Sequence, residues 1–313
     1  MVETILIIAG FILLYYGAEW LVAGGASFAV KAGVTPLVVG LTVVAFGTSC
    51  PELVVSIDAA IGHHGEISIG NVVGSNIFNI ALILGVSALV RPLKVQMQLI
   101  RFDVPVMIAA TILFVMFFWD RTFSRTEAVV FFVGLIVYMV TVVRMARKEV
   151  KKNIEAGISA EIHTEYGTVV CLFFIVAGLV ALVAGARVFV EGSVMIAQRF
   201  GISEAVIGLT IVAAGTSLPE LATSVMAAIK KQSDISIGNI VGSNIFNILC
   251  IVGIAGMIEP IYAPGISNSD IGVMVFTTLL LFPLMKTGFT ISRFEGAILV
   301  IIYIGYLCYL WPK

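Results

Sequence analysis

The sequence predicts an all-α integral membrane protein with ten transmembrane helices, arranged as two inverted five-helix repeats with broken helices at spans 2 and 7. Three observations predict this fold class. Hydrophobic residues make up 60% of the 313 residues and charged residues only 12%, about half the charged fraction of an average soluble domain. The apolar stretches are about 20 residues long, which is enough for a helix to cross a bilayer. Finally, a long segment of the chain occurs twice.

The repeated segments lie at a constant offset. Residues 40–53, GLTVVAFGTSCPEL, return at 208–221 as GLTIVAAGTSLPEL. Residues 70–80, GNVVGSNIFNI, return at 238–248 as GNIVGSNIFNI. Both returns lie 168 residues downstream (208 − 40 and 238 − 70), and roughly half of the paired positions are identical over the gapless register that joins 14–92 to 182–260. The chain therefore contains two related halves.

Polar breaks between the apolar stretches define the expected spans, which lie near 4–24, 35–61, 67–90, 102–119, 126–143, 167–190, 203–229, 235–258, 270–286 and 294–311. A polar segment rich in Lys, Arg and Glu, residues 144–166, divides the chain. We expect it to be a short cytoplasmic linker between a first five-helix repeat, 1–143, and a second, 167–313. The repeated motifs occupy 40–56 and 70–80 in the first repeat and 208–224 and 238–248 in the second.

Basic residues fall mainly on one side of the predicted membrane. Connections from odd to even spans carry thirteen of them: Lys31, Arg91, Lys94, Arg101, Arg144, Arg147, Lys148, Lys151, Lys152, Lys230, Lys231, Lys286 and Arg293. The positive-inside rule places these in the cytoplasm and both termini outside the cell. Glu52 and Glu220 then lie five spans apart, an odd number, so the two copies cross the membrane in opposite directions and form an inverted repeat.

Each copy of the GTSxPE motif places a proline directly before a glutamate inside an apolar span. Proline lacks an N–H and clashes with the carbonyl four residues back, so each helix is expected to break there. A break frees backbone carbonyls, and the neighbouring side chains add hydroxyl and carboxylate oxygens. The expected ligand positions are Ala45, Thr48, Ser49 and Glu52 in one copy, and Ala213, Thr216, Ser217 and Glu220 in the other.

The GNxxGSN motif begins the next span of each half. Ser75 and Asn79 are four residues apart and share a helical face, as do Ser243 and Asn247, so all four are expected ligands. The glycines of the motif, Asn71 and Asn239 are explained equally well by helix packing and interhelical hydrogen bonds. Asp58 has no acidic equivalent in the second copy and is interpreted as a solvated residue at the mouth of the site.

All of these ligand groups are oxygens, which calcium and sodium prefer, whereas soft metals call for Cys or His. An intramembrane carboxylate costs about 3 kcal/mol or more to insert, and a repeated pair of them indicates a cation site in a transporter. A second interpretation of each copy stays open. Ser49-x-x-Glu52 and Ser217-x-x-Glu220 also match the capping box that begins a helix.

These motifs resemble those of the sodium/calcium exchangers of the cation/calcium antiporter superfamily, which carry GTSxPE and GNxxGSN in each repeat. The resemblance covers all ten spans. It implies a secondary active antiporter of the cell membrane that exchanges calcium for sodium by alternating access and normally extrudes calcium. It also implies that spans one and six slide or rock against the other helices.

The resemblance assigns roles residue by residue. It implies that Glu52 and Glu220 are the central calcium ligands and also help to bind sodium. The matching hydroxyl or backbone ligands are Thr48, Ser49, Ser75, Thr216, Ser217 and Ser243, the carbonyl positions are Ala45 and Ala213, and the amide ligand is Asn79. Asn247 departs from the family, because well-studied prokaryotic members carry an aspartate there. This departure leaves open the sodium stoichiometry, the proton coupling and the charge moved per cycle.

The main alternative is a proton/calcium exchanger of the same fold, since buried glutamates can hold protons. A cation channel is less expected, because channel filters usually arise from rings of subunits. An enzyme is not expected, and a serine-type intramembrane protease in particular would want a histidine inside a span. No cofactor is expected; the transported ions are calcium and sodium, with protons possible. The expected partners are these ions and the lipid bilayer. No basic, aromatic-rich cluster indicates nucleic acid, and no protein partner is implied.

Overall fold

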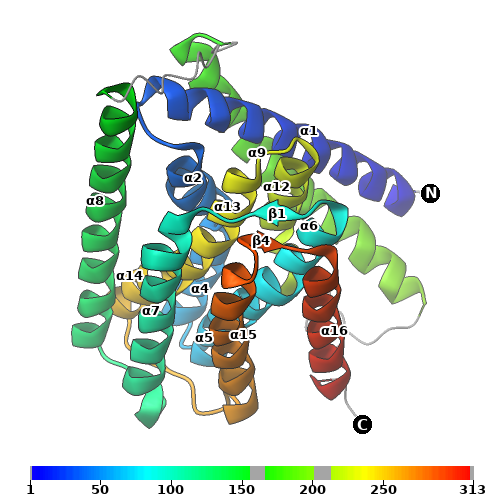
Figure 1. Ribbon diagram of the computed structural model, residues 1–313. Coiled ribbons are helices and arrows are strands. Elements are labelled where there is room, and N and C mark those ends of the chain that lie inside the picture. Colours follow the sequence, from blue (N-terminus) through cyan, green and yellow to red (C-terminus); the bar gives the residue numbers. More distant parts are fainter. Residues whose placement is uncertain (1, 156–165, 201–212, 311–313) are drawn as a thin grey trace.

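The computed structural model describes residues 2–155, 166–200 and 213–310, which are almost entirely helical (Figure 1). The first half contains α1 (Val2–Lys31), α2 (Pro36–Val39), η1 (Gly40–Val44), α3 (Ala45–Thr48), α4 (Cys50–Ile61), α5 (Gly65–Ile77), η2 (Phe78–Leu84), α6 (Gly85–Val90), β1 (Leu93–Lys94), η3 (Leu99–Asp103), α7 (Val104–Phe117), η4 (Phe118–Asp120), β2 (Thr122–Phe123) and α8 (Arg125–Glu155). The second contains α9 (Thr168–Arg199), α11 (Ala213–Gly215), α12 (Leu218–Ile229), α13 (Ser233–Phe246), η6 (Asn247–Val252), α14 (Gly253–Ile258), β3 (Ile261–Tyr262), α15 (Asn268–Lys286), β4 (Thr290–Ile291) and α16 (Arg293–Leu310).

Within these residues, eight helices are long and apolar enough to cross a membrane. A ninth candidate span is the pair Pro36–Thr48 and Cys50–Ile61, which is bent by 46° at its break. The all-helical membrane fold is therefore confirmed. The count of ten spans stays a prediction, because residues 203–212 of the expected seventh span lie outside the described residues.

Three helices run beyond the expected ends of their spans. The expected ends were residue 24 for α1, 143 for α8 and 190 for α9, but the helices reach Lys31, Glu155 and Arg199. The extension of α8 is rich in Arg, Lys and Glu, which are strong helix formers that need no bilayer. Helices α1 and α9, of 30 and 32 residues, are about 45 Å long, longer than the hydrocarbon core is thick.

Helices α1 and α9 pack closely along each other and tilt strongly relative to α7, α8, α15 and α16 (Figure 1). Glycines make the close packing possible. A Cβ on Gly17 would lie 2.9 Å from the carbonyl oxygen of Gly178, and a Cβ on Gly178 would lie 2.8 Å from that of Gly17. Similar contacts recur seven residues, or two helical turns, away on each helix. The two helices therefore meet backbone to backbone and can behave as one rigid pair.

The spans that carry GNxxGSN form the centre of the molecule. In the span from Gly65 to Val90, 78% of the most apolar window is buried, and in the span from Ser233 to Ile258 the share is 89%. In the other six described spans it is 11% to 39%. The polar motif residues are thus surrounded by protein rather than facing lipid.

Two short antiparallel strand pairs join the halves reciprocally. Strand β1 pairs with β4, with Leu93 opposite Ile291, and strand β2 pairs with β3, with Phe123 opposite Ile261. The offset of 168 residues maps β1 onto β3 and β2 onto β4 (261 − 93 and 290 − 122). Each half therefore supplies one strand to each pair, so the internal relation extends well beyond the two motifs.

Candidate cation-binding site

The helix break in the first half lies at Ser49, between α3 and α4. Ser49 has φ −83° and ψ 5°, and Pro51 follows in the first turn of α4. The second half repeats this geometry, since Ser217 has φ −91° and ψ 8°, with Pro219 in the first turn of α12. Neither serine side chain caps the helix that follows it. The capping-box interpretation therefore does not describe these serines.

The two serines instead reach across to the opposite half. Ser49 Oγ donates to Glu220 Oε1 at 2.8 Å, and Ser217 Oγ donates to Glu52 Oε1 at 2.8 Å. Ser217 Oγ also lies 3.2 Å from Ser75 Oγ. Both glutamates are only 1% exposed. The structure thus brings together Ser49, Glu52, Ser75, Ser217 and Glu220 between the two broken helices.

Five buried oxygens of the predicted ligands have no hydrogen-bond partner within the described residues: Glu52 Oε2, Glu220 Oε2, Asn79 Oδ1, Asn247 Oδ1 and Ser243 Oγ. A buried polar atom without a partner costs about 1–3 kcal/mol, and more if it is charged. Buried oxygens without donors are the kind of group that can coordinate a hard cation, and calcium takes about six to eight such oxygens. Among the described residues, neither glutamate forms an ion pair that would neutralise it.

Asn79 and Asn247, the two asparagines among the predicted ligands, lie where α-helix passes into π-helix. Asn247 is the first residue of η6, and Asn79 is the second residue of η2. A π-helical turn widens the helix and re-aims its side chains, and such turns are frequent at functional sites. The two asparagines thus occupy equivalent places in the two halves, next to the start of the π-helical turn.

The other motif asparagines hold the helices next to the site. Asn71 Nδ2 donates to the carbonyl oxygen of Glu52 at 3.0 Å and to Ser56 Oγ at 2.9 Å. Asn239 Nδ2 makes the equivalent bonds to Glu220 at 3.4 Å and to Ser224 Oγ at 2.9 Å. The interhelical hydrogen bonding considered for Asn71 and Asn239 is thus present.

The remaining predicted ligand positions lie at the breaks. Thr48 is fully buried and donates to Asn239 Oδ1 at 3.1 Å, which links the two halves. The carbonyl oxygen of Ala45 accepts a helical bond from the Ser49 N–H at 3.0 Å, and Thr48 Oγ1 lies 3.3 Å from it. In the second half, α11 begins at Ala213, and Thr216 directly precedes Ser217.

Two buried asparagines, Asn76 and Asn244, lie beside predicted ligands but were not themselves predicted as site residues. Asn247 Nδ2 points to Asn76 Oδ1 at 3.5 Å, an arrangement that leaves Asn247 Oδ1 free for an ion. Asn244, the equivalent of Asn76, also has a buried Oδ1 without a partner. Each precedes an expected ligand by three residues and shares its helical face, so the spacing could have identified both.

Comparisons with known proteins identify the family of the chain. The family described as sodium/calcium exchanger protein matches residues 2–144 and 170–311. Putative antiporter CaxA of Alkalimonas amylolytica is 37% identical over 98% of both chains. Sodium/calcium exchanger MaX1 of Methanosarcina acetivorans is 35% identical over 99% of both. A solved structure of the sodium-calcium exchanger NCX_Mj superposes with a TM-score of 0.85 at 34% identity, covering 100% of this chain and 99% of that one. The chain belongs to the sodium/calcium exchanger family of the cation/calcium antiporter superfamily.

Proposed function

We propose that this protein exchanges calcium for sodium across the cell membrane by alternating access and normally extrudes calcium. Membership of the family makes it a calcium/cation antiporter, and therefore a transporter rather than an enzyme. The observation that carries the finer proposal is the set of five buried oxygens that have no hydrogen-bond partner within the described residues. Two of them belong to the glutamates themselves, and the set comes from both halves. One calcium ion would neutralise both carboxylates and occupy the free oxygens.

Sodium would compete for the same oxygens. The proposed ligand set joins the two glutamates to Asn79, Asn247 and the hydroxyl groups of both breaks, namely Thr48, Ser49, Ser75, Thr216, Ser217 and Ser243, with Ala45 and Ala213 as carbonyl positions. Because the ions share ligands, calcium and sodium bind in turn rather than together. The crossed bonds from Ser49 and Ser217 support this site, because an ion that displaces either hydrogen bond changes the contact between the halves.

The proposed architecture is two inverted five-helix repeats, 1–143 and 167–313, joined by a cytoplasmic linker at 144–166, with both termini outside. The reciprocal strand pairs support it, because a two-fold relation between halves requires each contact to occur twice with its partners exchanged. The breaks at Ser49 and Ser217, with nearly the same backbone angles, support broken helices at spans 2 and 7.

Alternating access also needs a part that moves. We assign this role to the α1–α9 pair, which packs tightly upon itself and contributes none of the proposed ligands. Ion binding biases the inward- and outward-open states only if it differs between them. Neutralisation of Glu52 and Glu220 by bound ions would supply that difference.

The test is uptake of radioactive calcium into proteoliposomes under an outward sodium gradient, an outward proton gradient, or no gradient. We expect uptake with the sodium gradient alone. Uptake driven by protons alone would replace the proposal with a proton/calcium exchanger of the same fold. Single-channel current steps in a planar bilayer would overturn the carrier mechanism altogether.

A further inference from the structure

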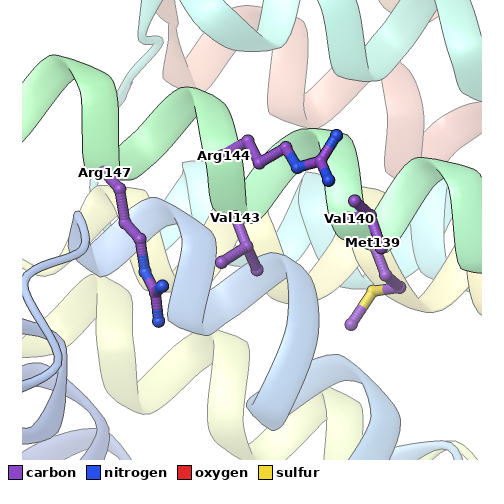
Figure 2. Close-up of a pocket in the computed structure, with 5 residues that line it drawn as sticks. All are labelled: Met139, Val140, Val143, Arg144 and Arg147. Atoms are coloured by element: carbon purple, nitrogen blue, oxygen red, sulfur yellow. The ribbon is translucent and has the colours of Figure 1, made fainter.

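The surface of α8 has a hollow at the end that leaves the membrane. Its volume is about 360 Å³, and it is lined by Met139, Val140, Val143, Arg144 and Arg147. Figure 2 shows the two arginine side chains extending from neighbouring turns, with the Val143 side chain between those of Arg147 and Met139. The hollow thus combines an apolar part and a strongly basic part. It lies outside the cation site, to which none of these residues belongs.

The hollow continues a stripe of exposed apolar residues along α8. Val133 is 51% exposed and Val140 is 42% exposed. Arg147 follows Val140 by seven residues, as Val140 follows Val133, so all three lie on nearly the same helical face. Val129, Ile136 and Val137 widen the stripe. An acyl chain that lies along this face ends its course at the arginines.

The depth of the arginines matches the level of lipid phosphates. Helix α8 begins at Arg125, and a helix rises 1.5 Å per residue, so Arg144 and Arg147 lie about 28 and 33 Å from that end. The hydrocarbon core is about 30 Å thick. If Arg125 marks one boundary of the core, the other arginines lie at the opposite headgroup layer.

Neither arginine has an acidic partner within the described residues. Two other basic side chains, by contrast, form ion pairs: Arg199 lies 2.6 Å from Glu3, and Lys230 lies 2.5 Å from Glu19. Arg144 and Arg147 are both exposed, and their guanidinium groups present planar donor arrays that suit a phosphate. The charge of the hollow is therefore available to an anion from outside the protein.

We infer that this hollow binds one anionic phospholipid. The phosphate lies between Arg144 and Arg147, and one acyl chain follows the stripe past Val140 and Val133. A zwitterionic lipid fits less well, because its own ammonium group competes for the phosphate. Free phosphate lacks the chain that fills the apolar part. Basic pockets beside membrane helices recognise lipid headgroups by the same combination of charge and depth.

The experiment is native mass spectrometry of the purified full chain in detergent, titrated separately with phosphatidylglycerol, phosphatidylcholine and inorganic phosphate. We expect one phosphatidylglycerol molecule to bind at least tenfold more tightly than phosphatidylcholine, and phosphate not to bind. The Arg144→Gln/Arg147→Gln variant should lose this preference. The Arg91→Gln/Lys286→Gln variant, which also lacks two exposed basic side chains, should keep it.

A second variant separates charge from shape. Arg144→Lys/Arg147→Lys keeps both charges but removes the planar donors, so we expect an affinity between those of the wild type and the glutamine variant. Equal phosphatidylglycerol affinity in the wild type and the glutamine variant would overturn the inference, as would an equal loss in the Arg91/Lys286 control. Binding of phosphate as tight as that of the lipid would show an anion site without a lipid.

Discussion

The two halves of the molecule make matching hydrogen bonds around the cation site but differ just outside it. Ser49 and Ser217 donate to the opposite glutamates at the same distance, 2.8 Å. Phe46, three residues before Ser49, has its ring centroid 5.6 Å from that of Phe246, whereas its equivalent in the second half is Ala214. The hydrogen bonds across the proposed site are thus alike in the two halves, while the aromatic contact of Phe46 has no equivalent at Ala214.

A second difference concerns α1 and α9. Glu19 on α1 forms an ion pair with Lys230 after α12. The equivalent residues in the other half are Arg187 and Gly62, which cannot form one. One end of the proposed moving pair is therefore held by a charge contact that has no counterpart, so the two open states need not be equally stable.

The largest effect should come from removing either carboxylate. Glu52→Gln and Glu220→Gln each leave the divalent ion with half of its neutralising charge. We expect calcium uptake to fall at least about 100-fold in each, because a lost charge at contact distance is worth several kcal/mol. Asp58→Asn removes an exposed carboxylate outside the site and should transport like the wild type. Wild-type uptake rates in both glutamine variants would refute the proposed site. A loss in only one variant would show that the two glutamates do not have equivalent roles.

The crossed serines should follow with a smaller loss. A hydrogen bond to a charged group contributes about 1.5–3 kcal/mol, so Ser49→Ala and Ser217→Ala should each weaken calcium binding about tenfold or more. The two losses should match, because the bonds have the same length. Ser193→Ala is the control, since that hydroxyl donates to the carbonyl oxygen of Phe189 in its own helix. The measurement is the calcium concentration at half-maximal uptake. Unequal losses would show that two hydrogen bonds of the same length contribute different free energies to calcium binding.

Replacing either Asn79 or Asn247 by aspartate adds a third carboxylate to the proposed site and tests whether the two amides have the same role. Asn247→Asp is expected to strengthen calcium binding roughly fivefold, since the added charge faces a divalent ion. The variant should lose uptake more steeply than the wild type as the pH falls, because the new carboxylate also accepts protons. Asn79→Asp should act in the same direction. The measurement is calcium uptake over a range of pH values and calcium concentrations. Unchanged dependence on both pH and calcium in Asn247→Asp and Asn79→Asp would contradict the prediction.

The smallest effect is expected at the ion pair outside the site. Exposed ion pairs contribute about 0–1 kcal/mol, so Lys230→Gln should change the ratio of inward to outward transport rates about twofold. The neighbouring Lys231→Gln removes the same charge without breaking that pair and should leave the ratio unchanged. Equal ratios in all three proteins would mean that the Glu19–Lys230 contact does not distinguish the two open states.

The motifs led to the residues of the proposed site but not to the way in which the two halves connect around it. Glu52, Glu220, Asn79 and Asn247 could be predicted because carboxylates and amides are costly inside a membrane unless they have a function. The crossing of Ser49 to Glu220 could not be predicted. The same spacing in each half is equally compatible with a bond inside one half, which is the capping box, and only packing between the halves decides. The helical extension of α8 was missed because charged residues end a hydrophobic span without ending a helix.

The reciprocal strand pairs have a consequence for how the chain matures. Strand β1 cannot complete its backbone hydrogen bonds until β4 has been made, and β4 belongs to the last tenth of the polypeptide. At a synthesis rate of about 5–20 residues per second, the 196 residues from Lys94 to Thr290 (290 − 94) take roughly 10–40 s to emerge. During that interval β1 in the first half has no partner strand. The two halves can therefore join through this strand pair only after β4 has been synthesised.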